Sequence, residues 1–373
     1  MSRLRAAVIG AGYFGRLHAS KLAAHPDVEL VAVADTDAGR AEKVAQEAGS
    51  RPVRGFGELI GSIDIASVTV PTELHHSIAR PLIDAGVHVL VEKPFARTLE
   101  QADELAHLAA ARGTVLAVGH QERFNPAFVA LRAVPGRALF IEAERLTEFR
   151  GRGTDVDIVL DLMIHDLDLV LALVGAEPVH VSACGFSVFT DALDIANARL
   201  EFASGCVANI SASRVSQSPV RKMRVFQADS YLSADLQGGQ LRCVRRAPAT
   251  ASGVVVEEQA FEGADPLGAE IAAFVGAVRN RTPVPVDGVD LADTAARIAR
   301  ERALDRVDGR QAARHRVQDR RAEVAVRHRL RRHRADARAD ERAGRADGEG
   351  LGRDGDGEGV GVGVVGDDRP GHG

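Results

Sequence analysis

The stretch Gly10-Ala11-Gly12-Tyr13-Phe14-Gly15 decides the fold, because it follows the apolar run Leu4–Ile9 and opens an amphipathic segment that ends near Ala24. Glycines in this spacing allow a tight turn and a close backbone approach, so that a pyrophosphate can bind at the N-terminus of the following helix. Asp35 lies about twenty residues after Gly15 at the end of a second apolar run, where a carboxylate binds ribose hydroxyls. We therefore predict a dinucleotide site made of Gly10, Gly12, Tyr13, Phe14, Gly15 and Asp35.

The residue at position 35 also predicts which dinucleotide binds. A carboxylate there accepts hydrogen bonds from ribose hydroxyls and repels a 2′-phosphate, which favours NAD over NADP. Arg40 is the nearest cation that could favour NADP, but it lies several residues into the next expected helix. We predict NAD as the cofactor.

The first 120 residues alternate short apolar runs with amphipathic segments. Val, Ile and Ala dominate the runs, which is typical of a parallel sheet covered on both faces. We predict an α/β fold whose N-terminal Rossmann domain spans residues 1–121. The expected strands are 4–9, 28–34, 63–70, 87–91 and 115–118, and the expected helices are 13–24, 38–48, 75–85 and 99–112.

Two further motifs supply groups for acid–base chemistry. Lys93 stands in a Glu-Lys-Pro tripeptide at the end of an expected strand, where open α/β sheets bind ligands. Asp161 and His165 are four residues apart, so a helix places them on one face. Oxidation of an alcohol needs a base for the hydroxyl proton, and an imidazole titrates near neutral pH. We predict that Lys93, Asp161 and His165 are catalytic and that His165 is the general base, with Asp166 and Asp168 as alternatives.

Composition excludes several other classes of function. The net charge of −5 argues against a nucleic-acid partner, because binding to phosphates needs clustered positive charge. No apolar run approaches the roughly 20 residues of a membrane span, and the N-terminus has no signal-peptide pattern, so we expect a cytoplasmic protein. Three scattered cysteines lack metal-ligand spacing, and we predict no metal site.

Motifs along most of the chain, from about residue 3 to residue 300, resemble those of the Gfo/Idh/MocA oxidoreductases, the superfamily of glucose–fructose oxidoreductase and inositol dehydrogenase. The shared motifs are the glycine run, Pro71-Thr72 with His75, Glu92-Lys93-Pro94, Arg123-Phe124-Asn125-Pro126, Asp161 to His165, Pro266-Leu267, Glu270-Ile271 with Phe274, and Pro285-Val286-Asp287-Gly288.

The resemblance implies a second domain, residues 122–300, with an α+β fold and a large, mostly antiparallel open sheet. Expected strands at 138–147, 179–186, 194–202, 207–213, 220–227 and 254–260, interrupted by a helix at 159–174, agree with it. It also implies a homodimer or homotetramer formed through this sheet, and a final helix that packs back on the first domain. Residues implied to contact the cofactor are Pro71, Thr72, His75, Glu92 and Lys93; Lys93 is also implied to bind the reacting hydroxyl.

The segments around 119–126 and 154–168 are similar to a narrower subgroup, the bacterial dehydrogenases that oxidise C3 of UDP-N-acetylglucosamine for lipid A sugar modification. Arginines suit the pyrophosphate of such a substrate. We predict that Arg123, Arg150 and Arg152, together with Arg145, surround the cleft entrance and that the first three bind substrate. A dehydrogenase of free sugars or inositol, and a non-catalytic NAD-binding sensor, remain alternatives.

The chain changes character at about residue 301. Beyond this point it contains no Ser, Thr, Asn, Lys, Ile, Phe or Tyr, and Arg, Asp, Gly, Ala, Glu and Val make up most of it. A segment of this composition buries too little apolar surface to fold. We expect residues 301–373 to be disordered and interpret them as the product of a frameshift in a GC-rich gene, with a genuine disordered extension as the alternative.

Overall fold

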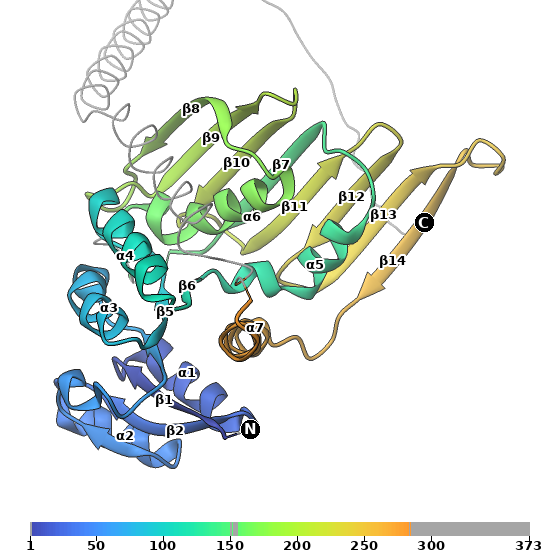
Figure 1. Ribbon diagram of the computed structural model, residues 1–373. Helices are drawn as coiled ribbons and strands as arrows, with labels where there is room; N and C mark the ends of the chain where they lie inside the picture. Colours follow the sequence, from blue (N-terminus) through green and yellow to red (C-terminus); the bar gives the residue numbers. More distant parts are fainter. Residues whose placement is uncertain (1, 150, 152–155, 283, 285–373) are drawn as a thin grey trace, which may run out of the picture. The chain divides into compact units, whose positions relative to one another are not determined.

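The computed structural model describes residues 2–149, 151, 156–282 and 284, which contain two β-sheets (Figure 1). The first, sheet A, is entirely parallel. Its strands, in spatial order, are β3 (Arg51–Val53), β2 (Val28–Ala34), β1 (Leu4–Ile9), β4 (Ile65–Val68), β5 (His88–Glu92) and β6 (Leu116–Gly119). This order reverses between β1 and β4, and ligands of such sheets bind where the carboxyl ends of the strands meet that reversal.

Successive side chains of each strand of sheet A point to opposite faces of the sheet, and apolar side chains on both faces are covered by helices. Ala6 and Val8 belong to the core shared with α1 (Tyr13–Ala24) and α2 (Ala38–Glu47). The intervening residues of β1 belong to the core shared with α3 (His75–Asp84) and α4 (Leu99–Arg112). The strands and helices expected in the first 120 residues are all present, and the predicted Rossmann fold is confirmed. The expected strand at 63–70 is shorter, at Ile65–Val68.

Sheet B has eight strands, and all neighbours are antiparallel except β7 and β10. In spatial order they are β14 (Val254–Ala260), β13 (Gln240–Arg246), β12 (Ser230–Asp235), β11 (Val220–Phe226), β7 (Phe140–Leu146), β10 (Val207–Ser213), β9 (Ile195–Phe202) and β8 (Pro178–Phe186). The predicted large, mostly antiparallel sheet is confirmed. The sequence did not predict β12 and β13, which form a hairpin around Gly238 and Gly239.

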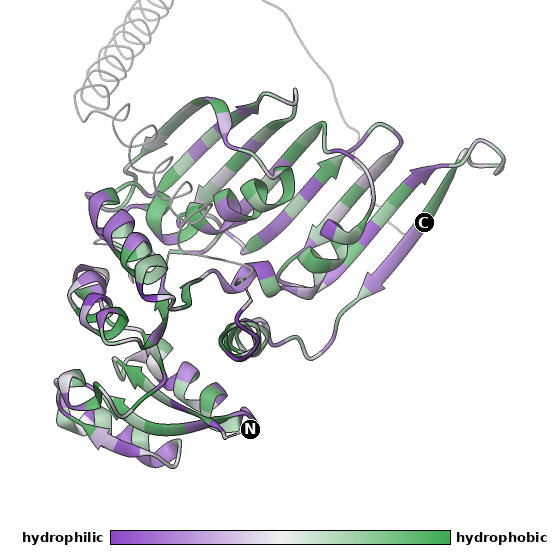
Figure 2. Ribbon diagram, in the orientation of Figure 1, coloured by the Kyte–Doolittle hydropathy of each residue, from purple (hydrophilic) through white to green (hydrophobic). Residues whose placement is uncertain are grey.

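Helices α5 (Pro126–Ala133) and α6 (Ile164–Val174) lie on one face of sheet B (Figure 1). Side chains alternate along the strands between apolar and polar, as the banding in Figure 2 shows. The apolar side chains face the helices, where Ile141, Ala143 and Met223 are buried. The opposite face carries no helix of the described residues and is mostly polar, apart from the aromatic residues Phe140, Phe226 and Tyr231; we call it the open face of sheet B.

After β14 the chain returns to sheet A through α7 (Pro266–Asn280). Ile271, Phe274 and Val275 of this helix share a core with Ala6 and Val8. The further helix expected from about residue 290, and the tail at 301–373, lie outside the described residues. In the part of the chain that the structure describes, no helix has the length and apolar character needed to cross a membrane.

Candidate functional site

The glycine turn after β1 is closed by contacts that only glycine permits. Gly10 has a φ of +103°, a conformation that side chains strongly disfavour. A Cβ on Gly15 would lie 1.7 Å from the carbonyl oxygen of Gly10, so α1 approaches the turn as closely as two backbones can. The Thr69 hydroxyl donates to the same carbonyl at 2.8 Å and joins the turn to the end of β4.

Gly12 is different, because nothing in the protein requires a glycine there. A Cβ built on it would meet no atom within 4 Å. It stands at the N-cap of α1, where no side chain caps the free N–H groups. Tyr13 and Phe14 follow in the first turn and are exposed. Free donors, a helix dipole and open space at Gly12 fit the pyrophosphate of a dinucleotide.

Asp35 is held at the end of β2 by three donors. Its carboxylate accepts from the Ala11 N–H at 2.7 Å, from the Asp37 N–H at 2.8 Å and from the Arg40 guanidinium at 2.9 Å. Burial opposes ionisation, but these hydrogen bonds outweigh it and lower the pKa of Asp35. The carboxylate is therefore ionised and fixed beside the glycine turn, as a ribose acceptor must be. Arg40 lies closer to it than the sequence suggested.

The segment after β4 places Pro71 and Thr72 at the same edge of sheet A, and His75 begins α3. His75 is buried, and both ring nitrogens face backbone carbonyls: Nε2 lies 2.8 Å from the Val70 oxygen and Nδ1 lies 3.0 Å from the Pro94 oxygen. In the structure this ring joins the loops after β4 and β5.

Lys93 follows β5 and points at the helical segment that carries Asp161. Its Nζ donates to the Asp161 carbonyl at 2.9 Å and lies 3.9 Å from the Asp161 carboxylate. The side chain is 14% exposed, and burial lowers the pKa of Lys93, although Asp161 and Glu92 act in the opposite direction. Glu92 itself accepts from the Lys93 N–H and bonds to His18. A lysine of lowered pKa is suited to proton transfer.

The predicted helix at 159–174 begins as one π-helical turn, Val159–Met163, before it continues as α6. Such turns are rare and occur frequently at functional sites. Asp161 is in the π turn, and His165 lies in the first turn of α6. Burial, together with the positive charges of Lys93 and Arg145, holds the pKa of His165 well below its ordinary value. Its imidazole is therefore neutral near pH 7, and its Nδ1 has no hydrogen-bond partner among the described residues.

Buried ion pairs fix α6 to its surroundings. Arg145 of β7 bonds to both oxygens of Asp166, at 2.9 and 3.0 Å, and to Glu122 at 2.9 Å. Arg123 bonds to both oxygens of Asp168, at 2.8 and 2.6 Å. The side chains of Arg123 and Arg145, 7% and 2% exposed, thus lie inside the protein and not at a cleft entrance. In such a place a carboxylate without a partner would be costly. Arg150 and Arg152, the other two predicted substrate residues, lie outside the described residues.

A pocket of about 470 Å³ opens beside Asp161. The other residues that line it are Thr147, Glu148, Phe149, Leu162, Arg214, Pro219, Arg221 and Gln237. None of these was predicted. One sequence signal could have identified Arg221, because it shares the core-facing side of β11 with Met223 and Val225. A charged residue on such a face needs a buried partner or a ligand.

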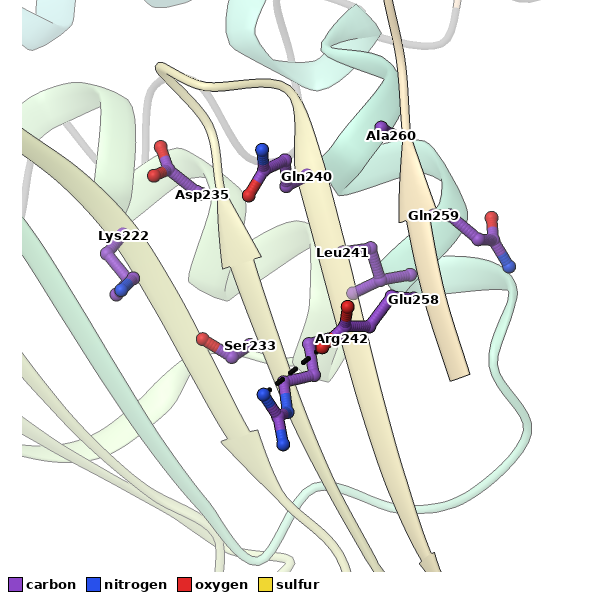
Figure 3. A pocket seen from close by; sticks show the side chains of 9 residues that line it. All are labelled: Lys222, Ser233, Asp235, Gln240, Leu241, Arg242, Glu258, Gln259 and Ala260. Carbon is purple, nitrogen blue, oxygen red and sulfur yellow. Dashed lines mark ion pairs between the residues drawn. The ribbon is translucent and has the colours of Figure 1, made fainter. Parts of the chain in front are cut away.

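A second hollow, of about 360 Å³, lies on the open face of sheet B (Figure 3). It is lined only by residues of β11 to β14, and the pair Arg242–Glu258 spans it at 3.1 Å. No strand-end residue of sheet A reaches it, so we do not assign it to the reaction. Among the residues described here, no three His, Cys, Asp or Glu side chains are arranged to hold a metal ion.

Dinucleotide binding and acid–base groups meet at one edge of sheet A, which is the arrangement of a nicotinamide-dependent oxidoreductase. Comparison with known proteins narrows this class. Residues 4–120 match the oxidoreductase family with an NAD-binding Rossmann fold, and residues 140–230 match the GFO/IDH/MocA C-terminal domain. The chain belongs to the Gfo/Idh/MocA oxidoreductases, as its motifs predicted, and its cofactor is NAD.

Among its relatives is a UDP-N-acetylglucosamine 3-dehydrogenase of Acidithiobacillus ferrooxidans, 43% identical over 78% of this chain and 93% of the relative. A solved structure of that enzyme matches with a TM-score of 0.77, over 82% of this chain and 97% of the other. A myo-inositol dehydrogenase of Streptomyces leeuwenhoekii is 40% identical over 48% of this chain and 58% of the relative. The sugar-nucleotide enzyme is thus matched over nearly its whole length, and this inositol dehydrogenase over little more than half of its length.

Proposed function

We propose that this protein oxidises a secondary hydroxyl of a sugar nucleotide, C3 of UDP-N-acetylglucosamine, with NAD as the hydride acceptor. The observation that carries the proposal is the contact of Lys93 with Asp161 beside an arginine-lined pocket. The extent of the match to an enzyme named for this reaction supports it. When bound, NAD supplies the nicotinamide ring that takes the hydride.

The three catalytic candidates divide the acid–base work. His165 is neutral and takes the hydroxyl proton, because its pKa is held low and one ring nitrogen has no partner among the described residues. Lys93 donates a hydrogen bond to the reacting oxygen and stabilises the alkoxide as it develops. Asp161 orients Lys93 through its carbonyl and its carboxylate.

The pocket beside Asp161 receives the nucleotide end of the substrate. Arg221 is the cation best placed for a diphosphate, because it lines the pocket and 44% of its side chain is exposed, although it also pairs with Glu122 at 3.5 Å. Phe149 offers an aromatic surface and packs edge-to-face on Phe189 at 5.3 Å, an arrangement suited to a uracil ring. Arg150 and Arg152 follow Phe149 in the sequence, and we retain them as substrate residues. Arg123 contributes indirectly, by fixing Asp168 on α6.

The test is NAD reduction by the purified protein with UDP-N-acetylglucosamine, free N-acetylglucosamine and myo-inositol as separate substrates. We expect turnover with the sugar nucleotide at the lowest KM. Arg221→Ala should raise that KM roughly tenfold or more, the effect of a lost charge-assisted contact, and leave the NAD Kd unchanged. Arg112→Ala, a half-exposed arginine of α4 paired with Asp84, is the control and should change neither.

Two outcomes would overturn the proposal. Turnover with inositol or a free sugar, and none with any UDP-sugar, would assign the protein to the second class of its relatives. Tight NAD binding without turnover on any of these substrates would favour a sensor.

We extend the proposal to the cell and to the assembly. The protein would act in the cytoplasm, and a partner transaminase would aminate its 3-keto sugar nucleotide for lipid A modification.

The open face of sheet B would form the interface of a homodimer or homotetramer. The aromatic residues Phe140, Phe226 and Tyr231 would lie in that interface; the ring centroids of Phe140 and Phe226 are 5.8 Å apart, and those of Phe226 and Tyr231 are 5.1 Å apart. Light scattering on the purified protein measures the assembly directly. We also retain the domain division at 1–121, 122–300 and 301–373, and the frameshift origin of the tail, which sequencing of the gene around codon 300 tests.

A further inference from the structure

Glu270, on α7, is a buried carboxylate to which the proposed reaction gives no role. Its exposure is 3%, and no side chain of the described residues donates a hydrogen bond to either oxygen; the His120 backbone N–H is the one donor that acts on it. It lines a small, otherwise apolar recess with Leu90, Val118 and Phe124, whose free volume of about 10 Å³ is too small for more than one water molecule. An ionised glutamate buried in such a place would destabilise the fold, so the residue is expected to be neutral or to be retained for a function.

The groups that interact with Glu270 are those that hold the catalytic side chains. Glu92 immediately precedes Lys93 and accepts from the Lys93 N–H at 3.3 Å. Asp168 lies one turn after His165 on α6. The titratable and charged side chains of this buried cluster are His18 of α1, Glu92 at the end of β5, His120 after β6, Arg123 in the following 3-10 turn, Asp168 of α6 and Glu270 of α7.

Two of the three carboxylates have partners. Asp168 receives both hydrogen bonds of the Arg123 guanidinium, and Glu92 bonds to His18 at 2.9 Å. Glu270 has no arginine or histidine partner of this kind, and the negative charges of Glu92 and Asp168 act on it unfavourably. Burial, the largest cause, and this repulsion raise the pKa of Glu270 well above its ordinary value, although the His120 backbone N–H acts in the opposite direction. A third anion in the cluster would therefore be strongly unfavourable.

We propose that Glu270 is a positioning residue for the oxidoreductase reaction, a neutral carboxylic acid that allows α7 to pack on the turn Gln121–Phe124 near Glu92 and Asp168, and so keeps Lys93 and His165 in register. Its position carries this inference, because α7 packs on α1 and on the 3-10 turn Gln121–Phe124 that follows sheet A. That turn contains Arg123, which fixes α6. Ionisation of Glu270 would repel both neighbouring carboxylates and displace the two catalytic side chains together.

The experiment compares the full-length protein with Glu270→Gln, which preserves the shape and neutrality of the acid, and with Glu257→Gln on β14, an exposed glutamate. Infrared difference spectra near neutral pH should contain the carbonyl band of a protonated carboxylic acid, which Glu270→Gln loses and Glu257→Gln keeps. Turnover of Glu270→Gln at neutral pH should stay within about fivefold of the unaltered protein, because a substitution that conserves volume disturbs its surroundings little. At alkaline pH the unaltered protein should lose kcat, whereas Glu270→Gln should retain it.

The infrared measurement needs no substrate, so it decides the charge of Glu270 even if the proposed reaction, on which the kinetic comparison rests, is wrong. Absence of the carbonyl band at neutral pH would show an ionised Glu270 and overturn the inference. Superimposable pH profiles of kcat for the unaltered protein and Glu270→Gln would also overturn it, because a merely structural role leaves the profile unchanged.

Discussion

The glycine turn and the catalytic cluster are built in opposite ways. The turn consists of consecutive residues, and two later residues fix it: Asp35 through the Ala11 N–H and Thr69 through the Gly10 carbonyl. The cluster joins Lys93, at the edge of sheet A, to Asp161, which is 68 residues later and beside sheet B. The turn is therefore sensitive to added volume at its glycines, whereas the cluster is sensitive to the loss of functional groups and to anything that separates the two sheets.

The largest effect is expected in the cluster. Lys93→Ala or His165→Ala should reduce kcat by about 10²–10⁴, the range for loss of a positioned acid–base group. NAD affinity should change little, because the glycine turn is intact. Steady-state NAD reduction and a separate NAD titration measure the two quantities.

Asp161→Asn is expected to have an intermediate effect on kcat. It should reduce kcat less than His165→Ala, because the backbone carbonyl that accepts from Lys93 remains. A protein with His165→Ala that kept nearly full turnover would require a different base, and the predicted alternatives, Asp166 and Asp168, are both held in ion pairs with arginines.

A matched pair of glycine substitutions tests the other region. Gly15→Ala brings a Cβ onto the Gly10 carbonyl and should lower the free energy of unfolding by about 1–3 kcal/mol, as overpacking does. Gly12→Ala meets no protein atom, so the Tm should not fall, but NAD should bind more weakly because the methyl group enters the space of the pyrophosphate. Equal NAD affinity of Gly12→Ala and the unaltered protein would contradict the placement of the cofactor.

Asp35→Ala changes one charge in the same region and should have a smaller effect. The unaltered protein should bind NAD at least about tenfold more tightly than NADP, the effect of one well-placed charge. The substitution frees Arg40, now 2.9 Å from the carboxylate, for a 2′-phosphate, so the preference should narrow. Competitive titration with both dinucleotides gives the ratio, and equal affinities in the unaltered protein would refute the role of Asp35.

The smallest effect is expected in the pH dependence of kcat/KM, which tests the protonation state of His165. Burial and nearby cations lower the pKa of His165, so the neutral base persists as the pH falls below the usual histidine value of about 6.5. The acid limb of the profile should therefore lie below pH 6.5 and disappear in His165→Ala. An acid limb at or above that value would mean that the imidazole is not shielded as described.

Much of the sheet A region was predictable because its signals are local. Apolar runs, glycine spacing and Asp35 are each read within a few residues, and the strand-end positions of Pro71 and Lys93 follow once the sheet is parallel. Sheet B was predicted in outline, but β12 and β13 were missed. The alternation of apolar and polar residues in these two strands is interrupted by Tyr231 in β12 and by Arg245 and Arg246 in β13. Such a pattern does not distinguish a strand from a loop until the partner strands are known.

The environment of the cluster could not be read from sequence, because it depends on pairings between distant residues. Arg123 and Arg145 were expected at a cleft entrance, but Asp168 and Asp166 hold them inside. The pocket beside Asp161 depends equally on distant strands, and only Arg221 carried a sequence signal, a charge on the core-facing side of β11. The exposure of Arg221 depends on the strands and loops that pack beside β11, and these cannot be identified from the sequence of β11 alone.

The central claim is that Lys93, which follows β5 of sheet A, and His165, on α6 beside sheet B, act as one catalytic unit. A double-mutant cycle with Lys93→Ala, His165→Ala and the combined variant measures this directly, with kcat for UDP-N-acetylglucosamine oxidation as the readout. If the two residues act together, the combined variant should be about as slow as the slower single variant. If the two losses multiplied, Lys93 and His165 would act independently, and the account of one cluster assembled from two sheets would be wrong.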